Sequence, residues 1–240
     1  MSGTEAGMPL LEMSDISAAY GPFRALFGVS LTVREGSVVA LLGANGAGKT
    51  TVARVASGLV RPTAGDVRVD GRDYAGRRPY RFARAGIVHA PEGRSVFATL
   101  SVEENLVLPF RSSGGRRGVG ERLTRAYDLF PRLGERRRQL AGSLSGGEQR
   151  MLALARVLTE PPRLLVADEL SLGLAPIVVD DVYRTLAAVR ETGTAILLVE
   201  QYVHHAMALA DDVVVLTKGE VSLAGPVSEL GDVAERLLPS

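Results

Sequence analysis

Residues 43–50, Gly-Ala-Asn-Gly-Ala-Gly-Lys-Thr, contain the residue types that bind phosphate. The glycines let the backbone fold tightly enough to aim consecutive N–H groups at an anion. Lys49 supplies a cation for the β and γ phosphates, and Thr50 places a hydroxyl where Mg²⁺ would bind. We call residues 43–50 the cradle. The nucleotide-binding residues predicted from the cradle and the threonine after it are Gly43, Asn45, Gly46, Gly48, Lys49, Thr50 and Thr51.

Two acidic residues end an apolar segment further along the chain. Residues 163–169 read Arg-Leu-Leu-Val-Ala-Asp-Glu, the pattern of a buried parallel strand with carboxylates at its carboxyl end. Open α/β sheets keep their chemistry at that edge. We therefore predict that Asp168 holds Mg²⁺ through water. Glu169 is predicted to be the general base that orients or deprotonates a water in line with the γ phosphate.

A second group of backbone donors precedes this strand. Ser145, Gly146 and Gly147 open a helix that is rich in alanine, leucine and methionine. A Ser-Gly-Gly sequence at a helix N-terminus can bind phosphate through its N–H groups and the helix dipole. The same three residues would also make an ordinary N-cap. Taken alone, they leave both interpretations open.

Apolar periodicity predicts the elements that position these residues. All-apolar strands are expected at 38–42, directly before the cradle, and at 194–199. Weaker alternation at 10–20 and 25–33 predicts an antiparallel edge. Helical periodicity takes over from 95 to 161. The predicted fold is therefore α/β, with a mixed core sheet, an antiparallel β edge layer and a helical subdomain.

Composition narrows the class of protein. With 240 residues and 46% hydrophobic content, the chain can bury a full core. The net charge of +1 gives no reason to expect nucleic acid as a partner. The absence of cysteine excludes thiolate metal sites, and His89 is interpreted as a packed strand residue because no second ligand stands at a useful spacing. No secretory leader and no apolar run of bilayer length are found, so we expect a cytoplasmic protein. The only lysines are Lys49 and Lys218, a bias from which the sequence alone supports no conclusion.

The order and spacing of the cradle, residues 144–149 (Leu-Ser-Gly-Gly-Glu-Gln) and the Asp168-Glu169 pair resemble the ATPase subunits of ABC transporters. The resemblance covers nearly the whole chain. It implies a P-loop NTPase of ABC type, with ATP and Mg²⁺ as cofactors and with Tyr20 stacking on the adenine. It also implies a nucleotide-binding core at 1–94 and 162–240 and a helical subdomain at 95–161.

In such an ATPase, ATP bridges two subunits. Lys49, Thr50 and Asp168 of one chain would oppose Ser145, Gly146 and Gly147 of its partner, so one chain supplies half of each site. The partner would be a second ATPase subunit, in a homodimer or a heterodimer.

A narrower resemblance rests on residues 91–97 (Pro-Glu-Gly-Arg-Ser-Val-Phe), 101–106 (Ser-Val-Glu-Glu-Asn-Leu), 171–176 (Ser-Leu-Gly-Leu-Ala-Pro) and 199–201 (Val-Glu-Gln). These look like the branched-chain amino acid importer ATPases. The resemblance implies transmembrane permease subunits, an external solute-binding protein acting indirectly, and a peripheral position on the inner face of the cell membrane. Importers for urea or short amides share much of this pattern and remain an alternative.

Four residues differ from the general ABC pattern. Leu170 replaces a proline, and Ala175 stands where most members have an aspartate in the loop after the acidic strand. Glu92 occupies the place of a glutamine that helps to hold Mg²⁺ and water, and Gln201 replaces the usual switch histidine near the γ phosphate. An uncharged amide can hydrogen-bond a phosphate oxygen or a water, but it supplies no positive charge. We expect Gln201 to take the catalytic role of that histidine. The alternative is an ATP-dependent clamp with weak intrinsic hydrolysis, paired with a more active sister ATPase.

Overall fold

The computed structural model describes residues 9–91, 96–114, 118–158, 161–201 and 203–230. Glu92, one of the predicted metal ligands, lies outside these ranges. The chain divides into two compact units. Unit 1 comprises residues 1–89, 162–169 and 190–240, and unit 2 comprises residues 90–161 and 170–189.

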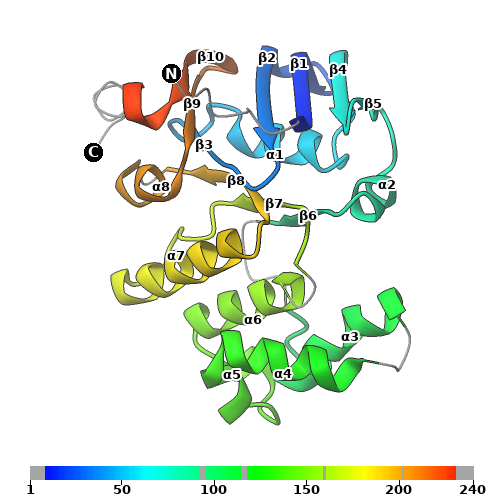
Figure 1. Cartoon of the computed structure of the whole chain (residues 1–240), viewed down its shortest axis with the longest axis vertical. Coiled ribbons are helices and arrows are strands. Elements are labelled where there is room, and N and C mark those ends of the chain that lie inside the picture. The colour runs from blue at the N-terminus through cyan, green and yellow to red at the C-terminus, as the bar shows by residue number, and fades with distance from the viewer. Residues whose placement is uncertain (1–8, 92–95, 115–117, 159–160, 202, 231–240) are drawn as a thin grey trace, which may run out of the picture. The chain divides into compact units, whose positions relative to one another are not determined.

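The six-stranded sheet of unit 1 carries the predicted strands around the cradle (Figure 1). Its order is β10-β9-β3-β8-β7-β6, and β3, β8 and β7 pair in parallel. The residues of these three central strands are all buried, because a parallel sheet is covered on both faces. The strands are β3 (Val38–Leu42), β6 (Ile87–Ala90), β7 (Leu164–Asp168), β8 (Ala195–Glu200), β9 (Asp212–Thr217) and β10 (Glu220–Pro226).

The second sheet of unit 1 is antiparallel, in the order β2-β1-β4-β5. It consists of β1 (Pro9–Tyr20), β2 (Phe23–Arg34), β4 (Ala64–Val69) and β5 (Arg72–Asp73). Helix α1 (Lys49–Ala56) contacts strands of both sheets, which places the helix after the cradle inside the core of the unit. The mixed core sheet and the antiparallel layer predicted from the sequence are both confirmed.

Unit 2 is helical and contains α3 (Val102–Gly114), α4 (Val119–Leu129), α5 (Pro131–Glu135), α6 (Gly146–Leu158) and most of α7 (Pro176–Glu191). Helices α3, α4 and α6 pack on one another (Figure 1). A capping box starts α3: the N–H of Ser101 donates to Glu104 Oε2 at 2.8 Å, and the N–H of Glu104 donates to Ser101 Oγ at 3.1 Å. The predicted helical character of this region is confirmed.

Unit 1 also contains two short helices, of which α2 has no counterpart among the predicted elements. Helix α2 (Pro79–Arg84) lies in an arginine-rich stretch whose periodicity is weak, and it begins with proline at its first position, which suits a helix start. Helix α8 (Val203–Leu209) follows β8. Within the described ranges, no helix is both long and apolar enough to cross a membrane.

Candidate functional site

The carboxyl ends of three adjacent parallel strands bring the predicted catalytic residues to one edge of the sheet. Leu42 of β3 pairs with Glu200 of β8, and Asp168 of β7 pairs with Val199 of β8. Because Gly43, Glu169 and Gln201 follow the last residues of β3, β7 and β8, all three lie at this edge. Gln201 forms a half-buried bend directly after β8.

Two glycines of the cradle have conformations that a side chain would disrupt. Gly43 has φ +155°, and a Cβ built there would lie 2.5 Å from the carbonyl oxygen of Leu216. Gly48 has φ +104° and caps the N-terminus of α1. A Cβ on Gly48 would lie 2.9 Å from Leu26 Cδ2. The backbone at these two positions therefore requires glycine, as a tight anion-binding turn does.

The Lys49 side chain lies along the inside of the cradle and is 3% exposed. Its ammonium group donates to the carbonyl oxygens of Gly43 at 2.9 Å and Ala44 at 3.3 Å. It also forms an ion pair with Glu169 Oε1 at 3.1 Å. The predicted phosphate cation and the predicted general base are therefore in direct contact.

The backbone of Glu169 has an unusual conformation and is fixed by a hydrogen bond to β8. It has φ +48°, a left-handed conformation that is uncommon for a residue other than glycine, asparagine or aspartate. Its N–H donates to the carbonyl oxygen of Val199 at 2.9 Å, and its side chain is nearly buried. Strained backbone of this kind is concentrated at functional sites.

Thr50, Asp168 and His89 form a polar chain at the same edge. The Thr50 hydroxyl donates to Asp168 Oδ1 at 3.3 Å. His89 Nε2 lies 3.7 Å from Asp168 Oδ2, and His89 Nδ1 lies 3.2 Å from Ser57 Oγ. His89 is thus a neighbour of a predicted metal residue, which sequence spacing did not indicate because 79 positions separate the two residues.

The oxygen atoms of Thr50 and Asp168 fit a hard divalent cation. Mg²⁺ is usually bound through one or two carboxylates together with substrate phosphates and waters, and a hydroxyl beside one carboxylate suits that chemistry. Among the described residues, no group of three or more His, Cys, Asp or Glu side chains could hold a metal by itself. The donor set therefore suits a cation that arrives with a phosphate.

A hollow of about 400 Å³ in unit 1 lies over the cradle. It is lined by Arg24, Ala25, Phe27, Gly46, Gly48, Lys49, Thr50, Thr51, Glu169 and Lys218. Five of these are predicted site residues from the cradle and its threonine, and Glu169 is a sixth. Sequence reasoning missed Arg24, Phe27 and Lys218. The only available signal was the rarity of lysine at Lys218.

Tyr20 lies beside this hollow without lining it. The ring is 42% exposed, and its hydroxyl lies 3.5 Å from Thr51 Oγ1. Arg54 donates to the same hydroxyl at 3.3 Å. These contacts anchor the polar end of the ring and leave part of it open to solvent.

The residues Ser145, Gly146 and Gly147 belong to unit 2, at the start of α6. Ser145 forms a capping box: its N–H donates to Glu148 Oε2 at 2.9 Å, and the N–H of Glu148 donates to its hydroxyl at 3.3 Å. A Cβ built on Gly147 would lie 2.8 Å from Val178 Cγ1 of α7. The N-cap interpretation is confirmed locally. The first N–H groups of a helix lack intrahelical partners, so this N-terminus also keeps donors for an anion.

Comparison with known proteins identifies relatives over nearly the whole chain. The family model described as ABC transporter matches residues 26–171. The high-affinity branched-chain amino acid transport ATP-binding protein BraG of Pseudomonas aeruginosa is 40% identical, covering 88% of this chain and 91% of its own length. The corresponding protein BraF of the same organism is 32% identical, covering 93% and 94%. A solved structure of an ATP-binding cassette of an ABC transporter in its ADP conformation matches with a TM-score of 0.80 and 26% identity, covering 92% of each chain.

Proposed function

Because this chain belongs to the ABC transporter family as an ATP-hydrolysing, nucleotide-binding subunit, we propose that it powers the import of branched-chain or related amino acids through a membrane permease. The observation that carries the ATPase half of this proposal is the contact of Lys49 with Glu169 inside the cradle hollow. The solute half rests on the names of its relatives, BraG and BraF.

Each predicted site residue that the structure describes has a role in this proposal. The cradle N–H groups and Lys49 would bind the phosphates. Thr51 lines the same hollow, and Tyr20, whose hydroxyl lies 3.5 Å from Thr51 Oγ1, would stack on the adenine. Glu169 accepts a proton from the attacking water. Thr50 and Asp168 would hold Mg²⁺, which when bound offsets the charge of the β and γ phosphates. Gln201 hydrogen-bonds the water or a γ-phosphate oxygen.

Two ATPase subunits would enclose the nucleotide. Ser145, Gly146 and Gly147 of a partner would bind the γ phosphate through the donors at the start of α6. A related cassette in its post-hydrolysis state is dimeric. BraF and BraG are two such subunits from one organism, which favours a heterodimer of this chain with a sister ATPase.

The test is transport by the assembled complex. The tagged chain would be purified with its membrane partners, reconstituted into proteoliposomes and supplied with ATP on the ATPase side. We expect ATP-dependent uptake of labelled leucine in the presence of the solute-binding protein. The Glu169→Gln complex should show none. Uptake of urea or acetamide without leucine uptake would instead support the short-amide alternative.

A clamp function is favoured by three departures from the general ABC pattern, Glu92, Ala175 and the uncharged Gln201. In that case the chain binds ATP and a sister subunit performs most of the hydrolysis. Steady-state ATPase activity of the purified chain, alone and with the sister subunit, distinguishes the two. Turnover by the chain alone that Glu169→Gln abolishes supports the active ATPase. Turnover that appears only with the sister, and that survives Glu169→Gln, supports the clamp.

A further inference from the structure

The two lysines of this chain come together at one place. Among 28 lysine and arginine residues, only Lys49 and Lys218 are lysines, and 169 positions separate them. Both line the cradle hollow. In a chain that uses arginine almost everywhere else, both lysines, which carry a compact and mobile point charge, therefore line the same hollow.

The backbone of Lys218 is as unusual as that of Glu169. Among the described residues, four other than glycine have positive φ, and two of them, Asp15 and Asp70, are aspartates, which tolerate this conformation. The other two are Glu169 at +48° and Lys218 at +51°, and both line the hollow. Asparagine or glycine would suit the Lys218 position better. A strained lysine at a cavity therefore points to function in its side chain.

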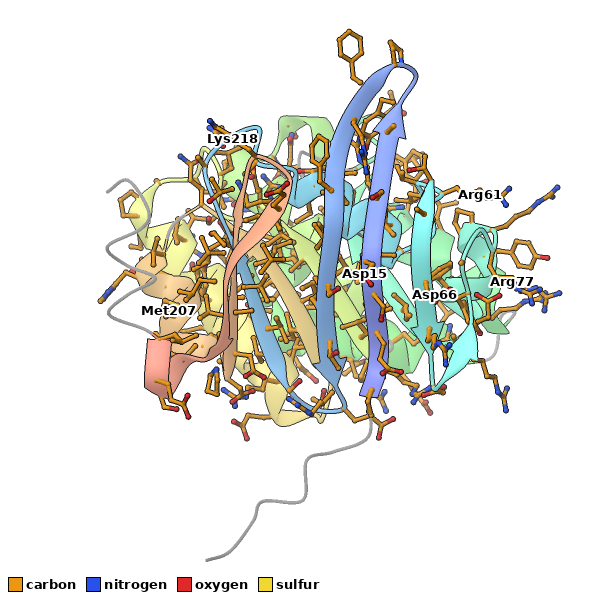
Figure 2. All side chains as sticks on the ribbon, turned by 90° about the horizontal axis from the view of Figure 1, so that it is seen from above. Asp15, Arg61, Asp66, Arg77, Met207 and Lys218 are labelled. Atoms are coloured by element: carbon orange, nitrogen blue, oxygen red, sulfur yellow. The ribbon has the colours of Figure 1, made fainter. Side chains whose placement is uncertain are left out.

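The turn between β9 and β10 that carries Lys218 is fixed to the cradle. The N–H of Gly219 donates to the Ala47 carbonyl oxygen at 2.9 Å, and the Gly219 carbonyl oxygen accepts from the N–H of Phe27 at 2.9 Å. A Cβ on Gly219 would lie 2.5 Å from the Ala25 carbonyl oxygen, so the close contact between this turn and the Ala25 backbone requires glycine. Lys218 is thereby held beside the hollow that it lines, and Figure 2 shows it at the turn between β9 and β10.

The other charged groups of the hollow already have partners. Lys49 is paired with Glu169 at 3.1 Å. Arg24 donates to Ser17 Oγ at 3.1 Å, and its guanidinium lies 4.8 Å from the centre of the Phe27 ring. Within the described part of the chain, the Lys218 ammonium makes neither a hydrogen bond nor an ion pair. It is the cation of the hollow that an entering anion can engage without breaking a contact.

We propose that Lys218 is a further nucleotide-binding residue whose ammonium group binds the phosphate chain of the bound nucleotide from the rim of the cradle. This inference rests on the proposed role of the hollow as the nucleotide site. The contact is exposed and electrostatic, so it adds affinity for each nucleotide that carries the α and β phosphates and weakens with salt.

Binding of ADP to the purified chain tests the proposal. Lys218→Asn removes the charge and places a favoured residue in the turn, whereas Lys218→Arg keeps the charge. We expect the ADP dissociation constant to rise about 3- to 10-fold in Lys218→Asn and to stay within about 2-fold of the parent in Lys218→Arg. The loss should shrink between about 50 and 300 mM salt. Adenosine binding should be unchanged.

A matched control removes one exposed arginine of the same unit. Arg77→Asn loses the same charge at the far side of unit 1 and should leave ADP affinity unchanged (Figure 2). Equal ADP affinity of Lys218→Asn and the parent would overturn the proposal. An equal loss of ADP affinity in both Lys218 variants, or a matching loss of adenosine affinity, would also overturn it. Either result would show that the substitution acts by changing the turn and not by removing the charge. If the parent chain itself does not bind ADP, the proposal that the hollow is the nucleotide site is wrong. If the parent binds ADP and Lys218→Asn binds it equally well, only the Lys218 inference is wrong.

Discussion

The Lys49 ammonium nitrogen lies 3.1 Å from Glu169 Oε1, and both side chains are almost fully buried. The charge that would bind phosphate and the charge that would activate water therefore neutralise one another. A phosphate entering the cradle would compete with Glu169 for this ammonium group. Phosphate binding would thus free the Glu169 carboxylate for a water, which couples activation of the base to the presence of substrate.

The first prediction follows from this competition. Glu169→Gln removes the charge that competes for Lys49, so the affinity for ATP should rise about 3-fold or more while turnover falls at least about 100-fold. Equilibrium binding of ATP and steady-state phosphate release measure the two effects. Glu121→Gln, which neutralises an exposed residue of α4, is the control and should change neither. Parental turnover in Glu169→Gln would remove this residue as the general base.

The second prediction compares two glycines of the cradle. A Cβ on Gly43 would meet the Leu216 backbone at 2.5 Å, whereas a Cβ on Gly46, at φ +79°, meets nothing within 4 Å. Gly46→Ala should therefore lower the free energy of unfolding by about 1 kcal/mol through backbone strain alone. Gly43→Ala should cost at least about 2 kcal/mol, because a backbone carbonyl must also move. Chemical unfolding followed by circular dichroism measures both; equal losses would contradict the steric argument.

The third prediction concerns the close approach of Gly147 and Val178 within unit 2. Alanine is normally favoured over glycine in a helix, but a Cβ on Gly147 would lie 2.8 Å from Val178 Cγ1 on a stiff β-branched side chain. Gly147→Ala should therefore destabilise the protein by about 1–2 kcal/mol. Val178→Ala added to it should restore most of that loss. A double variant as unstable as the sum of the two single variants would show that this contact is not the cause.

The residues at strand ends were predictable from the sequence, and the residues brought in by distant turns were not. Gly43 follows a short apolar run, and the Asp168-Glu169 pair follows another, so their place at the edge of a parallel sheet follows from the pattern. Lys218 reaches the same hollow from a hairpin turn that hydrogen-bonds to Ala47. No local pattern encodes that pairing, since it depends on the tertiary contact.

The contact of His89 with Asp168 and the helix α2 were not predicted from the sequence, also because neither follows from a local pattern. The interpretation of His89 as a packed strand residue agrees with its place in β6, but its approach to Asp168 Oδ2 depends on sheet order rather than spacing. Helix α2 was missed because Pro79–Arg84 buries a single side chain, Phe82, and so has almost no apolar period. The roles of the nucleotide-binding, metal and catalytic residues, and the domain boundaries, stay predictions.

The fourth prediction uses the cap of α6. Burial raises the pKa of Glu148, but hydrogen bonds with the N–H and hydroxyl of Ser145, together with Arg136 and Arg132, outweigh it and lower the pKa below its ordinary value of 4.5. A carboxyl whose pKa is lower in the folded state stabilises the fold above its unfolded pKa, and the stabilisation is lost as pH falls through the folded value.

Glu148→Ala should therefore lower the free energy of unfolding by about 1 kcal/mol at pH 7, the usual cost of losing a cap. The difference from the parent should shrink as the pH falls below about 4.5, where Glu148 of the parent takes up a proton in the unfolded and then in the folded state. Glu135→Ala, at the exposed last residue of α5, is the control and should show no such trend. Urea unfolding at several pH values measures the difference in the free energy of unfolding between each variant and the parent. A difference that stays constant down to pH 3 would show that the Glu148 carboxylate does not stabilise the cap through its charge.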